Sequence, residues 1–226
     1  MTNNGKLFIV PTPIGNLDDI TYRAIETLKN VDLVLAEDTR KSKILFKKHA
    51  ITTSLKSYHI NNEHRVVNLY VASLVDGKKI ALVSDAGTPS ISDPGFLLIR
   101  ESIKKNIEII CLPGATALIP ALVMSGLPSE KFVFEGFLPK KKGRDSRLKE
   151  LAIEKRTVIL YESPLRVIKT LQDLKEFFGS DRRISLSREI SKIYEETYRG
   201  TIEDAIAHLS NKNPKGEFVI CIDKLG

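Results

Sequence analysis

The sequence predicts an α/β protein of two domains, with a mostly parallel sheet in the first domain and a mixed sheet in the second. Strand-like apolar runs alternate with helical periods through the amino-terminal half, as in parallel sheets covered by helices. Near residues 184–200 two strand-like runs follow each other without a helix, which indicates an antiparallel pair. With 226 residues, of which 42% are hydrophobic, the chain can bury a sizeable core. We place the domains at residues 1–117 and 118–226, with a ligand cleft between them.

The elements of the first domain follow from its apolar patterns. Ile20, Ala24, Ile25 and Leu28 recur at helical spacing and predict one amphipathic helix. Strands are predicted at residues 7–10, 32–36, 80–84 and 109–112. Further helices are predicted through residues 44–46, near 66–74 and after 94–95.

The second domain has a different order of elements. We expect the boundary near residues 115–128, where a helical stretch ends in Ser125-Gly126-Leu127-Pro128, because glycine and proline terminate helices. Strands are predicted at residues 132–137, 157–161, 184–188, 195–200 and 217–223, and helices at 146–154, 165–178 and 202–209.

Composition excludes several classes of protein. No apolar run approaches the roughly 18 residues that a membrane span needs. Residues 1–6 lead straight into a strand without a secretory signal, so we expect a cytoplasmic protein and no membrane partner.

The few cysteines and histidines argue against a metal site. Cys111 and Cys221 each lie inside an apolar run and are expected to be small buried hydrophobes. The histidines are too loosely spaced for zinc ligands, and we expect no bound metal. These are His49, His59 and His64, with His208 alone in the last helix.

The loop after the first strand lacks the known nucleotide-binding fingerprints. Residues 11–19 carry no G-x-G-x-x-G glycines, and Pro13 removes an amide donor. The chain also lacks a Walker phosphate loop and a G-x-S-x-G elbow, which disfavours a nicotinamide or ATP enzyme. The polar residues Asn16, Asp18, Asp19 and Thr21 are expected to open a helix; alternatively, Asp19 is a plain helix cap.

Two turns of small residues end buried strands. Ser84-Asp85-Ala86-Gly87-Thr88-Pro89 and Pro113-Gly114-Ala115-Thr116-Ala117 stop apolar runs that would reach one edge of a parallel sheet. Small side chains let a ligand approach the backbone, and turn amides supply hydrogen-bond donors. We therefore interpret both as ligand-binding turns, the alternative being two tight turns without a ligand.

Three polar clusters lie beside predicted strands. They are residues 37–40 (Glu-Asp-Thr-Arg), 58–63 (Tyr-His-Ile-Asn-Asn-Glu) and 161–166 (Tyr-Glu-Ser-Pro-Leu-Arg). Each alone is also compatible with a helix cap and salt bridges. Because all three lie near strand ends, an active cleft is the better interpretation.

A basic loop is a candidate for contact with phosphates. The net charge is +7, and residues 139–147 hold five cationic side chains among glycine and proline. We expect these side chains to project into solvent and to meet the phosphates of a nucleic acid. A solvated loop without a partner is the alternative.

Taken together, these motifs resemble the tetrapyrrole methylase superfamily and, within it, the ribosomal RNA small subunit methyltransferase I family. The resemblance runs from about residue 7 to 222. Its marks are Pro11–Leu17, Ala36–Arg40, Ser84–Pro89, Pro113–Ala117, Tyr161–Pro164 and Gly216–Val219.

The resemblance implies an S-adenosylmethionine enzyme that methylates the 2′-oxygen of a cytidine in the decoding centre of 16S rRNA. It implies 16S rRNA or the small ribosomal subunit as partner, a homodimer, and a cofactor cleft between the two α/β domains. The implied cofactor-binding residues are Asp85, Ala86, Gly87, Thr88, Ala115, Thr116, Ala117, Phe137, Leu138, Gly216, Glu217 and Phe218. Those implied for the RNA are Gly15, Asn16 and Asp18, to which the basic loop adds Lys140, Lys141, Lys142 and Arg144.

A ribose hydroxyl is a weak nucleophile at neutral pH, so we expect a base to accept its proton. The candidates are Asp38, His59, Glu63 and Asp85. Alternatively, Arg40 or Lys41 lowers the pKa of the hydroxyl through its positive charge.

Two other functions stay open. One is methylation of a tetrapyrrole by the same fold, and the other is a non-catalytic RNA-binding module. Because many family members carry a further helical segment after the last strand, we expect the basic loop and a dimer partner to carry more of the RNA binding here.

Overall fold

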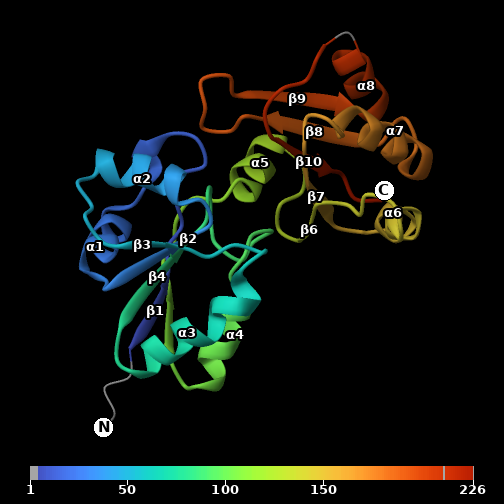
Figure 1. Cartoon of the computed structure of the whole chain (residues 1–226). Helices are drawn as coiled ribbons and strands as arrows, with labels where there is room; N and C mark the ends of the chain where they lie inside the picture. Colours follow the sequence, from blue (N-terminus) through green and yellow to red (C-terminus); the bar gives the residue numbers. More distant parts are fainter. Residues whose placement is uncertain (1–4, 211, 226) are drawn as a thin grey trace. The chain divides into compact units, whose positions relative to one another are not determined.

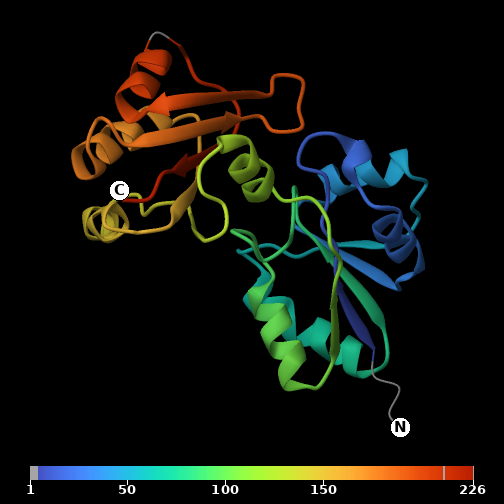
Figure 2. The same cartoon turned by 180° about the vertical axis from the view of Figure 1, so that it is seen from behind.

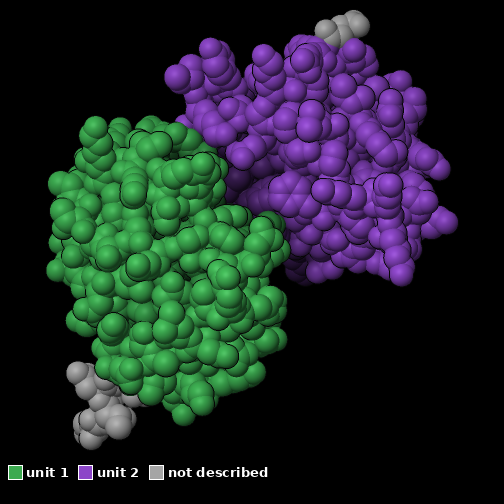
Figure 3. Space-filling model, viewed as in Figure 1, with its two compact units in different colours: residues 1–116 green, residues 117–226 purple. Residues whose placement is uncertain are grey.

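The computed structural model describes residues 5–210 and 212–225. Residues 1–4, on which much of the expectation of no secretory signal rests, lie outside the described part. The chain forms two compact units, residues 1–116 and 117–226, which Figure 3 shows in green and purple. Each unit is described by itself below.

The first unit contains a fully parallel sheet of five strands, shown in Figure 1. In space the strands follow the order β3-β2-β4-β1-β5. The strands are β1 (Lys6–Ile9), β2 (Leu33–Ala36), β3 (Leu55–Ser57), β4 (Lys79–Val83) and β5 (Glu108–Cys111). The helices are η1 (Leu17–Asp19), α1 (Tyr22–Asn30), α2 (Thr39–Lys48), α3 (Glu63–Val75) and α4 (Phe96–Lys104).

Helices cover both faces of this sheet because side chains alternate along each strand. On one face Leu7, Leu35 and Leu82 join a core with α3 and α4. On the other face Val34 and Ala81 join a core with α1 and α2. Figure 2, seen from behind, shows α3 and α4 together on one side of the strands. The predicted α/β class and parallel sheet are therefore confirmed.

The short strand β3 was not predicted from the sequence. Its three residues pair only with β2, at the edge of the sheet, and two of them are exposed. Such a strand needs no apolar run, so hydrophobic periodicity gives no signal for it.

The second unit contains a mixed sheet in the order β6-β7-β10-β8-β9. The β6–β7 pair is parallel, whereas the pairs β7–β10, β10–β8 and β8–β9 are antiparallel, which confirms the predicted mixed sheet. Its strands are β6 (Phe132–Gly136), β7 (Thr157–Glu162), β8 (Arg183–Arg188), β9 (Glu196–Thr201) and β10 (Phe218–Ile222). Its helices are α5 (Leu118–Ser125), α6 (Arg144–Ala152), α7 (Val167–Phe178) and α8 (Ile202–Ser210).

The core of the second unit lies between the sheet and the helices α6, α7 and α8. The helix α5 packs against β8 and β10 and ends at Gly126, whose φ of 70° favours glycine. The helix α8 begins with a capping box, in which Thr201 and Asp204 exchange hydrogen bonds between side chain and backbone.

The expected burial of both cysteines holds for one of them. Cys221 is buried in β10, and burial raises the pKa of its thiol to about 12. The prediction is wrong for Cys111, which is exposed because β5 is an edge strand. His208 lies in α8 as expected, and its ring stacks on Tyr198 with the centroids 4.5 Å apart.

Among the described residues, no group of three or more histidine, cysteine or acidic side chains could hold a metal ion. None of the helices in the described ranges is long and apolar enough to cross a membrane.

Candidate active site

The carboxyl ends of the parallel strands bring the predicted turns of the first unit together at one edge of the sheet. The loop after β1 pairs with the turn after β4, since Thr12 and Gly87 exchange two backbone hydrogen bonds of 2.9 Å. The Thr12 hydroxyl also donates to the Ser84 carbonyl at 3.0 Å. These bonds fix the position of the Asp85–Thr88 turn.

The turn after β5 joins the same edge. The Thr88 hydroxyl donates to the Ala115 carbonyl at 3.1 Å. Gly87 has a φ of 82°, and a Cβ on Gly114 would lie 2.6 Å from the Cβ of Pro11. Both glycines are therefore required by the backbone. The predicted cofactor residues Ala86, Gly87, Thr88, Ala115 and Thr116 are thus brought together, and Ala117 follows as the first residue of the second unit.

Asp85 connects this edge to the segment after β2. Its Oδ1 accepts a hydrogen bond from the amide of Asp38 at 2.9 Å, and its Oδ2 accepts one from Nζ of Lys41 at 2.7 Å. The Asp85 carboxylate is therefore already ion-paired and held in one orientation.

Asp38 and Arg40 form a helix cap and an ion pair, as in the alternative interpretation of this cluster. The Asp38 carboxylate accepts from the Arg40 amide at 2.9 Å and caps α2, and Nη2 of Arg40 lies 2.6 Å from Oδ2. Hydrogen bonds from the Arg40 side chain hold the pKa of Asp38 well below its usual range. A carboxylate with a lowered pKa is a weak proton acceptor, which argues against Asp38 as the base.

Glu37 is a functional candidate that the sequence analysis did not single out. It directly follows the buried residue Ala36 of β2, and its carboxylate lies against the backbone amide of Asp85. Burial, followed by the negative charge of Asp85, raises the pKa of Glu37. An acidic residue immediately after a buried strand was the signal that would have identified it.

His59 lies in the segment before α3, next to the buried Tyr58, and Glu63 is the first residue of α3. The Tyr58 hydroxyl donates to Oε2 of Glu63 at 3.4 Å, and burial raises the pKa of this phenol. The His59 amide donates to Asn62, whereas its Nδ1 is buried without a hydrogen-bond partner in the described part of the chain.

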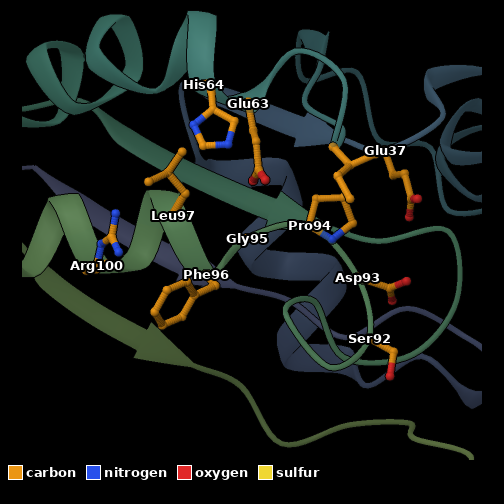
Figure 4. A pocket seen from close by; sticks show the side chains of 11 residues that line it. Glu37, Glu63, His64, Ser92, Asp93, Pro94, Gly95, Phe96, Leu97 and Arg100 are labelled. Atoms are coloured by element: carbon orange, nitrogen blue, oxygen red, sulfur yellow. The ribbon is translucent and has the colours of Figure 1, made fainter. Parts of the chain in front are cut away.

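A pocket of about 390 Å³ lies at this edge of the first unit (Figure 4). Its volume is at the lower end of the range for small-molecule sites. Glu63 and His64 reach it from α3, and Glu37 from the end of β2. The loop before α4 and the first turns of α4 supply Ser92, Asp93, Pro94, Gly95, Phe96, Leu97 and Arg100. Of the predicted catalytic residues, only Glu63 lines this pocket, since Asp38, Arg40 and His59 do not.

The loop with Gly15 is exposed, and its polar side chains serve local structure. Asn16 caps η1 by accepting from the amide of Asp18 at 3.1 Å. Asp18 pairs with Lys48 of α2, which lowers the pKa of Asp18. The alternative of Asp19 as helix cap is wrong, because the hydroxyl of Thr21 caps α1.

In the second unit, the basic loop does expose Lys140, Lys141 and Lys142. The prediction is wrong for Arg144, which is 5% exposed. Its guanidinium donates to Asp173 at 2.7 Å and to the Pro139 carbonyl at 3.0 Å. The helix α6 begins at this residue and directs it to an acidic partner on α7, so Arg144 is not free to bind a phosphate.

Hydrogen bonds from two arginine side chains hold the start of the basic loop. Arg144 also donates to the Thr170 hydroxyl at 2.9 Å, and this hydroxyl donates to the buried Glu162 at 2.7 Å. Arg166 donates to the Leu138 carbonyl at 2.9 Å. The Tyr-Glu-Ser-Pro motif thus has a structural role through Glu162.

The remaining predicted cofactor residues lie in the second unit. The Phe137 ring is exposed and lies edge-on to Tyr161, with the centroids 5.8 Å apart. Glu217 donates its amide to Glu189, which also lies against Gly216. The side chains of Leu138 and Phe218 are buried in the core, so these two residues offer a ligand only their main chain. That these residues contact a cofactor stays a prediction.

Comparison with known sequences gives a consistent result. The family model of Tetrapyrrole (Corrin/Porphyrin) Methylases matches residues 6–206. A protein of Thermotoga maritima is 46% identical over 218 residues, which cover 96% of this chain and 98% of that protein. One of Synechocystis sp. is 51% identical over 219 residues, or 96% of this chain and 78% of that protein. Both carry the name ribosomal RNA small subunit methyltransferase I.

Solved structures share the fold. A cobalt precorrin-4 methyltransferase has a TM-score of 0.71 at 18% identity and covers 96% of this chain and 94% of its own. A uroporphyrin-III C-methyltransferase from Thermus thermophilus, complexed with S-adenyl homocysteine, has a TM-score of 0.67 at 16% identity. This comparison covers 96% of this chain and 97% of that one.

Proposed function

Because this chain belongs to the ribosomal RNA small subunit methyltransferase I family of the tetrapyrrole methylases, we propose that it methylates ribosomal RNA of the small subunit. The finer proposal is transfer from S-adenosylmethionine to the 2′-oxygen of a cytidine in the decoding centre of 16S rRNA. The observation that carries it is the identity of 43–51% to relatives of this name over nearly the whole chain.

The first unit supports a cofactor site at the turns after β4 and β5. The residues fit an extended organic ligand, because Gly87 and Gly114 keep two main-chain segments close and Ala86 and Ala115 present little side-chain bulk. We propose that Asp85–Thr88 and Ala115–Ala117 hold its methionine and ribose parts. When bound, S-adenosylmethionine supplies an electrophilic methyl group.

The chain's own residues have to orient the ribose hydroxyl and accept its proton. Holding the reacting groups in place lowers a barrier by roughly 7–11 kcal/mol. For the proton, we propose Glu37, since its raised pKa makes its carboxylate a better acceptor than that of Asp38. Glu37 also adjoins Asp85 of the proposed cofactor turn.

The proposed RNA contacts come from the basic loop and from the loop after β1. Three exposed lysines, Lys140–Lys142, lie in a loop that hydrogen bonds from Arg144 and Arg166 anchor. The side chains of such a loop can neutralise phosphates without sequence preference. Gly15, Asn16 and Asp18 stay proposed contacts of the RNA, and the homodimer stays a prediction that light scattering of the purified protein tests.

The test is methyl transfer from tritiated S-adenosylmethionine to small ribosomal subunits that lack the modification. We expect label in the RNA with the wild type and none with Glu37→Gln, although this variant still binds the cofactor. Cofactor binding without transfer to any RNA would favour a non-catalytic module. Transfer to a tetrapyrrole instead would favour the other alternative, which the description of the matching family model and solved structures of 16–18% identity support.

A further inference from the structure

The pocket beside Glu37 presents an aromatic ring that is largely exposed. Phe96, at the start of α4, is 64% exposed and lines the pocket. The guanidinium carbon of Arg100 lies 5.4 Å from the centroid of this ring. An exposed ring beside an arginine is a surface on which nucleobases stack.

The polar groups of the pocket are mainly hydrogen-bond acceptors. Three carboxylates, from Glu37, Glu63 and Asp93, outnumber the single guanidinium of Arg100, and the imidazole of His64 and the hydroxyl of Ser92 complete the polar lining. Three negative charges disfavour a phosphate in this pocket. They suit a neutral ligand with N–H donors on its edge, and carboxylates accept hydrogen bonds from the exocyclic amine of cytosine.

We infer that this pocket takes the base of the target nucleotide, which stacks on Phe96 while a carboxylate of the pocket accepts from its exocyclic amine. The inference rests on the proposed function, because it concerns the RNA substrate of the same site. Sequence-specific recognition of RNA uses unstacked bases, which stack on aromatic side chains and form hydrogen bonds along their edges. The volume of about 390 Å³ is suited to one nucleotide unit rather than to a run of bases.

Glu63 is the carboxylate that the structure orients best for this role. It extends from α3 toward the start of α4 in Figure 4. The Tyr58 hydroxyl, which is fixed in the core, donates to its Oε2. This bond holds the carboxylate before a substrate arrives, which makes Glu63 a specificity-determining residue and leaves Glu37 to the proton.

The experiment compares Phe96→Ala and Glu63→Gln with Ile103→Ala. Ile103 is a matched control because it lies on the same helix, is 57% exposed and does not line the pocket. The substrates are small subunits reconstituted with cytidine or uridine at the nucleotide that the wild type methylates. Steady-state methyl transfer gives kcat and KM for each, and calorimetry gives the affinity for S-adenosylmethionine.

We expect Phe96→Ala to raise KM for the RNA about tenfold with unchanged cofactor affinity, because a stacking partner is lost. Glu63→Gln should lower the preference for cytidine over uridine at least about tenfold, since an amide can also donate to the uracil carbonyl. Kinetics of Phe96→Ala equal to those of Ile103→Ala, or an unchanged preference in Glu63→Gln, would overturn the inference. If the wild type labels no RNA at all, the proposed function fails instead.

Discussion

The main-chain amide of Asp38 donates a hydrogen bond to the Asp85 carboxylate across 47 positions of sequence, at 2.9 Å. With the Lys41 ion pair on its other oxygen, Asp85 joins the segment after β2 to the turn after β4. The same turn is tied to the loops after β1 and β5. One carboxylate therefore organises the edge of the sheet to which the cofactor is assigned.

Replacing Asp85 with alanine should weaken the binding of S-adenosylmethionine by about tenfold or more. The change removes an acceptor from a backbone amide and a charge-assisted bond, which are worth about 1.5–3 kcal/mol. Isothermal calorimetry measures the affinity. Glu108→Ala is the control, since Glu108 forms an exposed ion pair with Lys6 at the start of β5. Equal affinities of the two variants would remove Asp85 from the cofactor site.

Neutralising the lysines of the basic loop should flatten the salt dependence of RNA binding. Each lost phosphate contact lowers the slope of log affinity against log salt by about one. The variant is Lys140→Gln with Lys141→Gln and Lys142→Gln, measured by filter binding between low and high salt. Lys78, Lys79 and Lys105, which are exposed at the opposite edge of the first sheet, provide a charge-matched triple control. A slope that changes equally in both triples would show that only net charge matters.

Arg144→Ala should destabilise the protein by about 3 kcal/mol, because it leaves Asp173 without its buried partner. Lys169→Ala removes the exposed partner of the same carboxylate and should cost about 0–1 kcal/mol. Urea unfolding followed by circular dichroism compares the two. Similar midpoints for both variants would contradict the structural role of Arg144.

Glu37→Gln should stabilise the fold near neutral pH although it abolishes transfer. The pKa of Glu37 is raised in the folded state, so its carboxyl binds protons more tightly there than in the unfolded chain. The Glu37 carboxyl therefore contributes to folding stability below its ordinary pKa of 4.5. This contribution is lost as the pH rises through the pKa that the carboxyl has in the folded state. Thermal melts should show a higher Tm than the wild type at pH 7 and no gain at pH 4. A gain of the same size at both pH values would mean that the raised pKa is not its cause.

The parts of the fold and of the candidate site that could be predicted are those marked by a pattern of neighbouring residues in the sequence. The turns at Asp85–Thr88 and Gly114–Thr116 stand where apolar runs stop, and parallel strand ends bring them together. Arg144 was misjudged because its partner Asp173 lies 29 positions away on another helix. Cys111 was misjudged because an apolar run does not tell an edge strand from a central one.

The pocket could not be predicted from the sequence either. Glu63 was a candidate from its polar neighbours, but Phe96 lies on α4, and nothing local connects the two residues. The packing of α3 against α4 brings them to one pocket, and this packing depends on the whole core of the first unit.

The most direct test of the account is the chemical position of the methyl group on the RNA. Small subunits from a strain without this gene are incubated with the purified protein and tritiated S-adenosylmethionine. The RNA is then hydrolysed with alkali. Methylation of a ribose 2′-oxygen blocks cleavage of the next phosphodiester, so we expect the label in an alkali-resistant dinucleotide that begins with cytidine. Label in a mononucleotide would place the methyl group on a base and contradict the account.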